Sequence, residues 1–546
     1  MELRAVKMFR IAIVFSVLCI ISVSGDYFSA ISELEKLLDV ETLMIEKFEA
    51  YLQRAQEEQD NIRRFLDHID EVQHDRGDLE DFFGNPLNSF ITIRRLVHDW
   101  KFNVFDPVFE TSNFETYKSS LSESLVKIKG YKGPSQEDLQ GAIRALLRLQ
   151  KTYQLPTDQL AKGVLPMEEN QLNISLSASD CFEVGKDLCQ IKEYSYASEW
   201  LLEATKKKHG KPEGLISPNV TEVEILEHLS PAFNGLGNLK LAHKLNNEIL
   251  DWEPDHEEAL NNQILFESQL AKERVLARKQ EDLNQLSEKE KKESFQLYQR
   301  VCRGELRQSP RELRSLKCWL SHQGSPYHVI SPFKMEQLKL DPYVAFVHEM
   351  LSESETQMFK DLGKGRMERS KIGQGKSSTT TDIRTSQTHW LWPAQNQGLA
   401  KIMKRLEDFT GLSSESAEPF QLINYGLGGQ YEPHYDFMND DGYGVYGWKG
   451  NRLFTSIFYL NDVALGGGTA FPFLKLVVPP VKGSLLIWYN LHRSTYKDYR
   501  AKHAGCPVLK GSKWICIEQF HVGGQEFKRP CGLESDEGKF IDLIDK

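Results

Sequence analysis

Apolar residues recur every three to four positions along the N-terminal part of the chain. Alternate steps of three and four residues from Ile31 to Gln73 meet an apolar side chain at ten of thirteen positions. This spacing predicts a helix with one apolar seam, which is typical of a coiled coil over about six heptads. A long amphipathic helix that packs inside a single subunit is the alternative. Gly84 and Pro86 end the pattern, and further helices are expected at 87–101 and 136–153.

Residues 171–275 show two pairs of amphipathic helical segments, each pair joined by a glycine or a polar turn. The second pair ends in Leu250, Trp252 and Pro254, which is close to a tetratricopeptide pattern. Such stacks of helices present a concave groove that suits an extended peptide. Tyr194, Tyr196 and Trp200 are candidates to line this groove, because aromatic rings pack well against polyproline II chains. Packing in the helical core is the alternative for these aromatic residues.

The sequence pattern of the chain changes after a charged run at 271–294, which we take as a domain boundary. From residue 340 onward, short β-rich segments alternate with Gly, Pro and Asp. Many short strands with turn signals predict a double-stranded β-helix, which is a jelly-roll sandwich. The whole chain is therefore expected to be an α+β multidomain protein. The candidate strands are 419–425, 431–438, 452–461, 475–479, 483–490 and 512–521.

The first twenty-five residues resemble a secretory signal peptide, with basic residues before the apolar run Ile11–Val23. An uncleaved anchor is the alternative, although the run is short for a membrane span. No other stretch is long and apolar enough to span, so no membrane association is expected of the mature chain. Asn173 and Asn219 begin glycosylation motifs. The net charge of −11 and the absence of a long basic block argue against nucleic-acid binding.

The segment "YEPHYDF" holds the most informative polar pair of the chain. His434 and Asp436 stand two residues apart, so on a strand they would point to the same face. His503 lies sixty-nine residues later, and Lys513 follows it by ten. Two histidines and a carboxylate form the facial triad of non-haem Fe(II) oxygenases, which leaves coordination positions open for a co-substrate and O₂. Lys513 could hold the far end of a dicarboxylate co-substrate.

Several longer segments carry a resemblance to the catalytic α subunit of collagen prolyl 4-hydroxylase, and they extend over nearly the whole mature chain. That family uses Fe(II), 2-oxoglutarate, O₂ and L-ascorbate to hydroxylate proline in collagen-like repeats. The segments are "GNPLNSFITIRRLVHDW", "GAIRALLRLQKTYQL", "VCRGELRQSPRELRSLKC", "NYGLGGQYEPHYDF", "GNRLFTSIFYLNDVALGGGTAFP", "KGSLLIWYNL", "HAGCPVL" and "GQEFKRPCG".

The resemblance implies roles for further residues. His521 is expected to assist co-substrate binding at the 1-carboxylate. Orientation of the substrate or the pocket is expected of Arg384, Tyr431 and Arg452. Two disulfides are implied, Cys302–Cys318 and Cys506–Cys531. The second helical repeat carries His228, Pro231 and Phe233 where the family is rich in tyrosine, and Cys189 also departs from the family pattern.

The resulting domain map is a signal peptide at 1–25, a helical dimerisation domain at 26–165, a peptide-binding domain at 171–275, a linker at 276–335 and a dioxygenase domain at 336–535. The resemblance implies an α₂β₂ tetramer with protein disulfide isomerase as β subunit, self-association through the N-terminal helix, and residence in the endoplasmic reticulum lumen. The chain lacks a Lys-Asp-Glu-Leu type ending. Two alternatives remain open: the same chemistry on another secreted proline-containing protein, and a non-catalytic peptide-binding assembly subunit.

Overall fold

The computed structural model divides the chain into two compact units, Met1–Gln285 and Leu286–Lys546. It describes residues 31–52, 60–74, 76–106, 134–165, 174–209, 220–276, 285–323, 326–373, 379–438, 442–529 and 532. The expected signal segment and the glycosylation acceptors Asn173 and Asn219 lie outside these ranges. Among the helices that are described, none is both long and apolar enough to cross a bilayer.

The first two described helices, α2 (Ile31–Leu52) and α3 (Asp60–His74), pack against each other within one chain. Thr42 donates to Gln73, and Arg63 pairs with Glu49, so the two helices run antiparallel. The apolar seam is therefore buried inside the subunit. This agrees with the alternative to a coiled coil, in which an amphipathic segment packs within a single subunit. The chain reverses between α2 and α3 and does not continue as one helix over six heptads. The buried side chains of this core are Val40, Met44, Phe48, Ile62, Phe65, Leu66, Ile69, Trp100, Val104 and Phe105.

One polar position of the seam, Glu41, is fully buried. Its two carboxylate oxygens accept from Arg95 Nε at 2.7 Å and Nη2 at 2.9 Å, and Trp100 Nε1 donates to the first oxygen at 3.2 Å. A buried ion pair is stable only when its hydrogen bonds are satisfied. Glu41 therefore joins α2 to the segment that carries Arg95 and Trp100.

The helices after α3 begin where capping residues predict. Asp78 caps α4 (Leu79–Gly84), and Asn85 caps α5 (Pro86–Arg94), which has proline at its first position. Two π-helical turns continue α5, η2 (Arg95–Asp99) and η3 (Lys101–Phe105). α8 (Gln136–Tyr153) and α9 (Thr157–Ala161) follow. The helices expected at 87–101 and 136–153 are confirmed.

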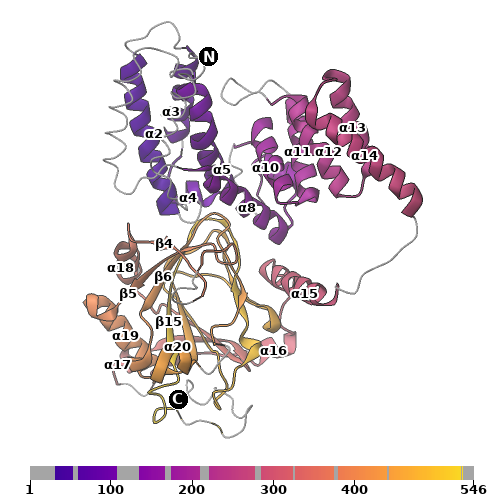
Figure 1. The fold of residues 1–546 in the computed structure, drawn as a ribbon. Helices are drawn as coiled ribbons and strands as arrows, with labels where there is room; N and C mark the ends of the chain where they lie inside the picture. Colours follow the sequence, from indigo (N-terminus) through magenta and orange to yellow (C-terminus); the bar gives the residue numbers. More distant parts are fainter. Residues whose placement is uncertain are drawn as a thin grey trace. The chain divides into compact units, whose positions relative to one another are not determined.

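The helical-repeat region predicted from the sequence is confirmed, but it has five consecutive helices (Figure 1), one more than the two predicted pairs. Capping boxes begin the first helix at Ser177 and the third at Thr221. The buried Arg94 pairs with Asp180 at 2.8 Å and so connects α5 to this region. The helices are α10 (Ala178–Gln190), α11 (Tyr194–Lys208), α12 (Glu222–Gly235), α13 (Leu239–Trp252) and α14 (Glu257–Leu276).

The second unit is a β-sandwich, as expected of a double-stranded β-helix. Its larger described sheet has nine strands in the order β1-β2-β3-β12-β8-β15-β6-β5-β4, all paired antiparallel. These strands are β1 (Cys318–Ser321), β2 (Phe333–Leu340), β3 (Tyr343–His348), β4 (Glu368–Arg369), β5 (Gln387–Leu391), β6 (Phe420–Tyr425), β8 (Arg452–Tyr459), β12 (Leu485–Tyr489) and β15 (Lys513–His521).

Four further strands form the second sheet in the order β11-β10-β13-β7, and a short pair β14-β9 lies apart from both. The six strands that the sequence predicted all appear, with ends that differ by a few residues. The other nine described strands, β1 to β5, β9, β10, β13 and β14, were not predicted. The strands are β7 (Tyr431–His434), β9 (Leu465–Gly466), β10 (Thr469–Phe471), β11 (Leu476–Val478), β13 (His503–Gly505) and β14 (Val508–Lys510).

Alternation along the strands gives the large sheet two buried faces. One face packs against α18 (Glu353–Gly363) and α19 (Gln397–Thr410), which lie beside it in Figure 1. The opposite face, which carries Ile423, Tyr425 and Ile515, packs against residues of the smaller sheet such as Phe471 and Val478. The inner face between the sheets is where the site lies.

The segment expected as a linker, 276–335, contributes structure to the second unit. It holds α15 (Gln285–Cys302), α16 (Pro310–Arg314), β1 and α17 (Pro326–Ile330). Tyr298 and Val301 of α15 are buried against Ala470 and Ala504 of the smaller sheet.

The disulfide of this region is Cys302–Cys506. It corrects the predicted pair Cys302–Cys318, because Cys318 is exposed and carries a thiol. It also excludes Cys506–Cys531, and Cys531 lies outside the described residues. The bond fixes α15 to the residue directly after β13. Two halves of the unit that are 204 residues apart in the chain are thereby connected.

Candidate active site

The two predicted histidine ligands face each other across neighbouring strands of the smaller sheet. β7 and β13 are antiparallel, and His434 is directly paired with His503. Asp436 Oδ1 lies 3.8 Å from His434 Nε2, and its Oδ2 lies 3.6 Å from His503 Nε2. Ligand atoms of all three residues lie within 4.8 Å of one another. The structure thus brings together the three residues that the sequence singled out.

Hydrogen bonds orient each ligand. His434 Nδ1 lies 2.8 Å from the Glu432 carbonyl oxygen, and His503 Nδ1 lies 3.1 Å from that of Ala501. Each carbonyl accepts from the Nδ1–H, which leaves both Nε2 atoms as lone-pair donors toward a metal. Thr455 Oγ1 donates to Asp436 Oδ2 at 2.7 Å.

The protonation states suit a divalent cation. Burial, and next the charge of His503, lowers the pKa of His434 to about 3, so its imidazole is neutral at pH 7. Burial opposes the ionisation of Asp436, but His503 and His434 outweigh it, and the pKa of this carboxyl is below its usual value. Two imidazoles and one carboxylate whose ligand atoms converge in this way fit Fe(II).

Lys513 begins β15 and is 2% exposed. Its Nζ lies 5.5 Å from the centre of the Tyr425 ring and 5.8 Å from that of Tyr459. Among the described residues no carboxylate lies within ion-pair distance of it, and burial lowers its pKa to about 7. A buried ammonium without a counter-ion is costly. Lys513 therefore fits the far carboxylate of a dicarboxylate co-substrate.

Two predicted substrate residues lie beside the triad. The Tyr431 ring stacks on His434 with centroids 3.5 Å apart, and the Arg384 guanidinium lies 4.9 Å from the Tyr431 ring centre. Residues 384 and 431 form an isolated antiparallel bridge. Arg384 and Tyr431 therefore stand at the edge of the metal centre, as expected of residues that orient a substrate.

His521 and Arg452 meet at a carboxylate that the sequence analysis missed. Glu418 accepts from Arg452 Nε at 2.6 Å and Nη2 at 3.1 Å, and His521 Nε2 lies 3.0 Å from Glu418 Oε1. His521 Nδ1 is also engaged, 2.7 Å from the Gly450 carbonyl oxygen. Both ring nitrogens are thus bound to the protein. The expected contact of His521 with the 1-carboxylate has no support in this arrangement.

This network reaches the metal centre through Arg452, whose Nη1 lies 3.3 Å from the main-chain oxygen of Asp436. Burial raises the pKa of Glu418, but its hydrogen bond from His521 and the charge of Arg452 outweigh burial and lower it to about 2. Two basic site residues that are both expected to be buried require an acidic partner. That requirement was the signal that could have pointed to Glu418.

Two further polar residues support the triad from apolar strands. Asn490 Nδ2 donates to Thr455 Oγ1 at 2.8 Å, and Trp488 Nε1 donates to Asn490 Oδ1 at 2.8 Å. The rings of Trp488 and Phe471 lie 4.6 and 5.9 Å from that of His503. A polar residue inside an apolar run, as in "RLFTSIFYL" and "LLIWYN", is the sequence signal for such a role.

The aromatic residues proposed for the peptide groove differ in their surroundings. Trp200 is 1% exposed and donates to Gln150, so it belongs to the helical core and does not line a groove. The Tyr194 ring lies against Gly235 of α12, where an added Cβ would approach it within 2.3 Å. Tyr196 is half-buried, with Lys151 Nζ 5.6 Å from its ring centre. Tyr196 keeps its place as a groove candidate, whereas Tyr194 packs between two helices.

The fold and the site define an oxygenase that uses a 2-histidine-1-carboxylate metal centre and an oxo-dicarboxylate. Sequence models of known families agree with each region. Residues 30–167 match the prolyl 4-hydroxylase alpha-subunit N-terminal region, residues 178–272 match the prolyl 4-hydroxylase peptide-substrate-binding domain, and residues 420–521 match the 2OG-Fe(II) oxygenase superfamily.

Whole-chain relatives give the same result. Prolyl 4-hydroxylase subunit alpha-1 of Gallus gallus is 33% identical over 527 residues, which cover 94% of this chain and all of that protein. The Homo sapiens subunit alpha-1 is 33% identical over 94% of this chain and 96% of its own length. Subunit alpha-2 of Caenorhabditis elegans is 31% identical over 94% of both chains. The chain belongs to the prolyl 4-hydroxylase alpha-subunit family.

Proposed function

We propose that this chain is the catalytic α subunit of a procollagen-proline 4-hydroxylase, which hydroxylates proline in collagen-like X-Pro-Gly sequences. The observation that carries the proposal is the triad His434, Asp436 and His503 together with the buried Lys513, which has no carboxylate within ion-pair distance among the described residues. The family supplies the expected reaction, and L-ascorbate is the expected reductant.

Fe(II) and 2-oxoglutarate, when bound, supply the oxidation of a substrate C–H bond by O₂, with succinate and CO₂ as co-products. His434, Asp436 and His503 would hold the metal, and Lys513 would bind the 5-carboxylate. The apolar rings of Trp488 and Phe471 exclude water on the side of His503. Arg384 and Tyr431 would hold the peptide at the edge of the site, because the Tyr431 ring stacks on His434 and the Arg384 guanidinium lies over that ring.

The reaction can be tested on the complex of this chain with protein disulfide isomerase, supplied with Fe(II), 2-oxoglutarate and ascorbate. A (Pro-Pro-Gly)-type peptide should gain one oxygen atom per succinate formed, measured as 4-hydroxyproline by mass spectrometry. His434→Ala should remove this product. The matched control is His348→Ala, a histidine of the same unit that is 42% exposed and pairs with Glu336. Equal product from the wild-type chain and from His434→Ala would refute the ligand assignment.

An alternative substrate is favoured by the residues of the helical-repeat region that differ from the tyrosine-rich family pattern. His228 stacks on Phe182 with ring centroids 5.5 Å apart, and the Cys189 thiol lies 3.6 Å from the His228 carbonyl oxygen. Burial, and next the charge of Lys186, lowers the pKa of His228. These residues replace a tyrosine-rich surface, which supports another secreted, proline-containing protein as substrate. Hydroxyproline mapping with candidate secreted proteins beside the collagen-like peptide tests this alternative.

Assembly and location complete the proposal. Protein disulfide isomerase is the proposed β subunit of an α₂β₂ tetramer in the endoplasmic reticulum lumen, where the signal segment 1–25 would direct the chain. Expression without the isomerase should give an insoluble or secreted chain. A lone chain that is soluble, active and retained would refute the partner. The Cys302–Cys506 disulfide is consistent with an oxidising compartment.

A further inference from the structure

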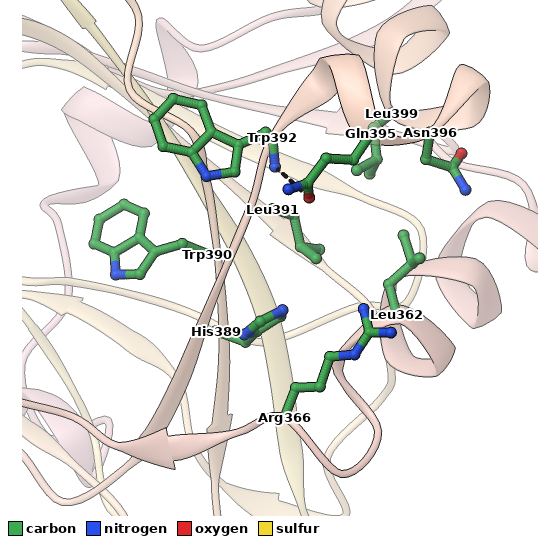
Figure 2. A pocket seen from close by; sticks show the side chains of 9 residues that line it. All are labelled: Leu362, Arg366, His389, Trp390, Leu391, Trp392, Gln395, Asn396 and Leu399. Carbon is green, nitrogen blue, oxygen red and sulfur yellow. Dashed lines mark hydrogen bonds between the residues drawn. The ribbon is translucent and has the colours of Figure 1, made fainter.

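Two large indoles stand exposed at the end of one strand of the catalytic unit. Trp390 of β5 is 42% exposed, and Trp392, two residues on, is 55% exposed. The backbone of Trp392 is extended, so both side chains leave the same side of the chain. Figure 2 shows their rings on one side of β5, whereas His389, Leu391 and Arg366 lie on the other side. Exposed tryptophans that stand together are uncommon unless a partner covers them.

The side that carries the tryptophans is the inner face of the sheet, which also carries the active site. Trp390 pairs directly with Gln421 of β6. On that strand Ile423 and Tyr425 belong to the core between the two sheets, whereas Leu422 belongs to the core under the helices. Since every second residue shares a face, Gln421 and its neighbour Trp390 belong to the inner face.

A continuous series of contacts links this surface to the metal centre. Gln421 Oε1 accepts from Arg384 Nη2 at 3.2 Å. The Arg384 guanidinium lies over the Tyr431 ring, and that ring stacks on His434. With cross-strand neighbours about 5 Å apart, Trp390 lies within about 20 Å of His434, which is the length of roughly six residues of polyproline II.

The polar groups of this surface are hydrogen-bond donors. Arg384 is 7% exposed, yet its Nε has no hydrogen-bond partner among the described residues. Gln421 uses its oxygen toward Arg384, which leaves its amide nitrogen to donate, and each indole offers one N–H. A proline-rich strand is the complement, because proline offers carbonyl acceptors, no N–H and an apolar ring.

We propose that Trp390 and Trp392, with Gln421 and Arg384, form a binding site on the catalytic unit for the proline-rich flank of the peptide substrate. The site would hold residues within about six positions of the proline at the metal, at about 3.1 Å per residue. This inference rests on the proposed function. It names a surface within the catalytic unit itself that selects the substrate.

The test is a series of proline-rich peptides of three to about ten residues, assayed with the full chain in its complex. For Trp390→Ala and Trp392→Ala, the ratio of KM to that of the wild-type chain should grow with peptide length and reach about tenfold. The matched control is Tyr327→Ala, an aromatic residue of the same unit that is 85% exposed. Its KM should equal the wild-type value at every length. Trp390→Phe, which keeps a ring, should recover most of the affinity.

The outcomes separate this inference from the proposed function. A KM ratio that does not grow with length, or an equal change in Tyr327→Ala, overturns the binding site and leaves the reaction intact. Loss of the isomerase from the purified complex with no change in KM assigns the indoles to the partner and also overturns it. A wild-type chain that hydroxylates no peptide of any length refutes the proposed function, and this inference with it. Trp392 lies beyond the end of β5, so its truncation leaves the strand pairing in place should Trp390→Ala fail to fold.

Discussion

The N-terminal unit and the catalytic unit each bury a cation, but in opposite ways. Arg95 is 3% exposed and makes two hydrogen bonds to Glu41. Lys513 is 2% exposed and has no carboxylate among the described residues. The loss of hydration is costly in both places, and among the described residues a carboxylate offsets this cost only at Arg95. A buried charge that has its partner is costly to disturb, whereas a buried ionisable group without a partner points to a ligand that binds there.

The largest effect is expected from a change at the metal centre. Asp436→Ala should reduce peptide hydroxylation by about a thousandfold or more, because the triad loses its carboxylate ligand. Stoichiometric Fe(II) binding, measured by metal analysis after gel filtration, should be lost with it. Asp361→Ala, on the exposed side of α18, is the control and should retain both. Retained Fe(II) in the Asp436 variant would place the metal elsewhere.

Loss of the buried ion pair between Glu41 and Arg95 should lower the stability of the N-terminal unit. Glu41→Ala leaves Arg95 buried without its partner, and we expect a loss of about 3–5 kcal/mol in the free energy of unfolding of the N-terminal unit. Thermal denaturation measures this loss, and the exposed Glu46 of the same helix provides the control variant Glu46→Ala. If Glu41→Ala halved the mass of the assembly without lowering its stability, the seam would serve a contact between subunits.

Removal of the unpaired cation should weaken co-substrate binding. Lys513→Met keeps the volume of the side chain but loses the charge, and we expect the KM for 2-oxoglutarate to rise about fiftyfold, or about 2.3 kcal/mol. The free chain should become more stable near pH 7, since it no longer buries an unpaired charge. An unchanged KM would show that another residue binds the 5-carboxylate.

The pH dependence follows from the pKa of Lys513, which burial lowers from 10.5 to about 7. Stability that is present above pH 10.5 should fall as the pH decreases toward 7, where the buried amine takes up its proton. A bound carboxylate favours the charged form and raises this pKa. Binding of 2-oxoglutarate at pH 8 should therefore take up protons, measured by calorimetry in two buffers of different ionisation enthalpy. Lys513→Met should abolish the uptake.

The sequence predicted the metal centre better than the buried ion pair of Glu41 and Arg95, for a physical reason. His434 and Asp436 are neighbours on a strand, and strand alternation alone places them on one face. Glu41 and Arg95 lie 54 positions apart, and heptad spacing does not say which surface covers a seam. The Cys302–Cys506 bond was missed because it depends on the docking of α15 against the smaller sheet. Glu418 was missed because the need of Arg452 and His521 for an acidic partner does not show which carboxylate supplies it, and a lone acidic residue before a strand carries no pattern of its own.

The smallest effect is expected at Tyr194, and it decides whether this ring packs between helices or binds the peptide. A Cβ at residue 235 would approach Tyr194 Cδ2 within 2.3 Å. Gly235→Ala should therefore cost about 1–3 kcal/mol through overpacking between α11 and α12. Tyr194→Ala removes the clash, so the double variant should be more stable than the sum of the two single changes predicts. Urea denaturation of the four chains measures this coupling. Weaker peptide binding by Gly235→Ala at unchanged stability would instead show that Tyr194 lines the peptide groove. The helical-repeat region would then also hold an aromatic surface that binds a ligand.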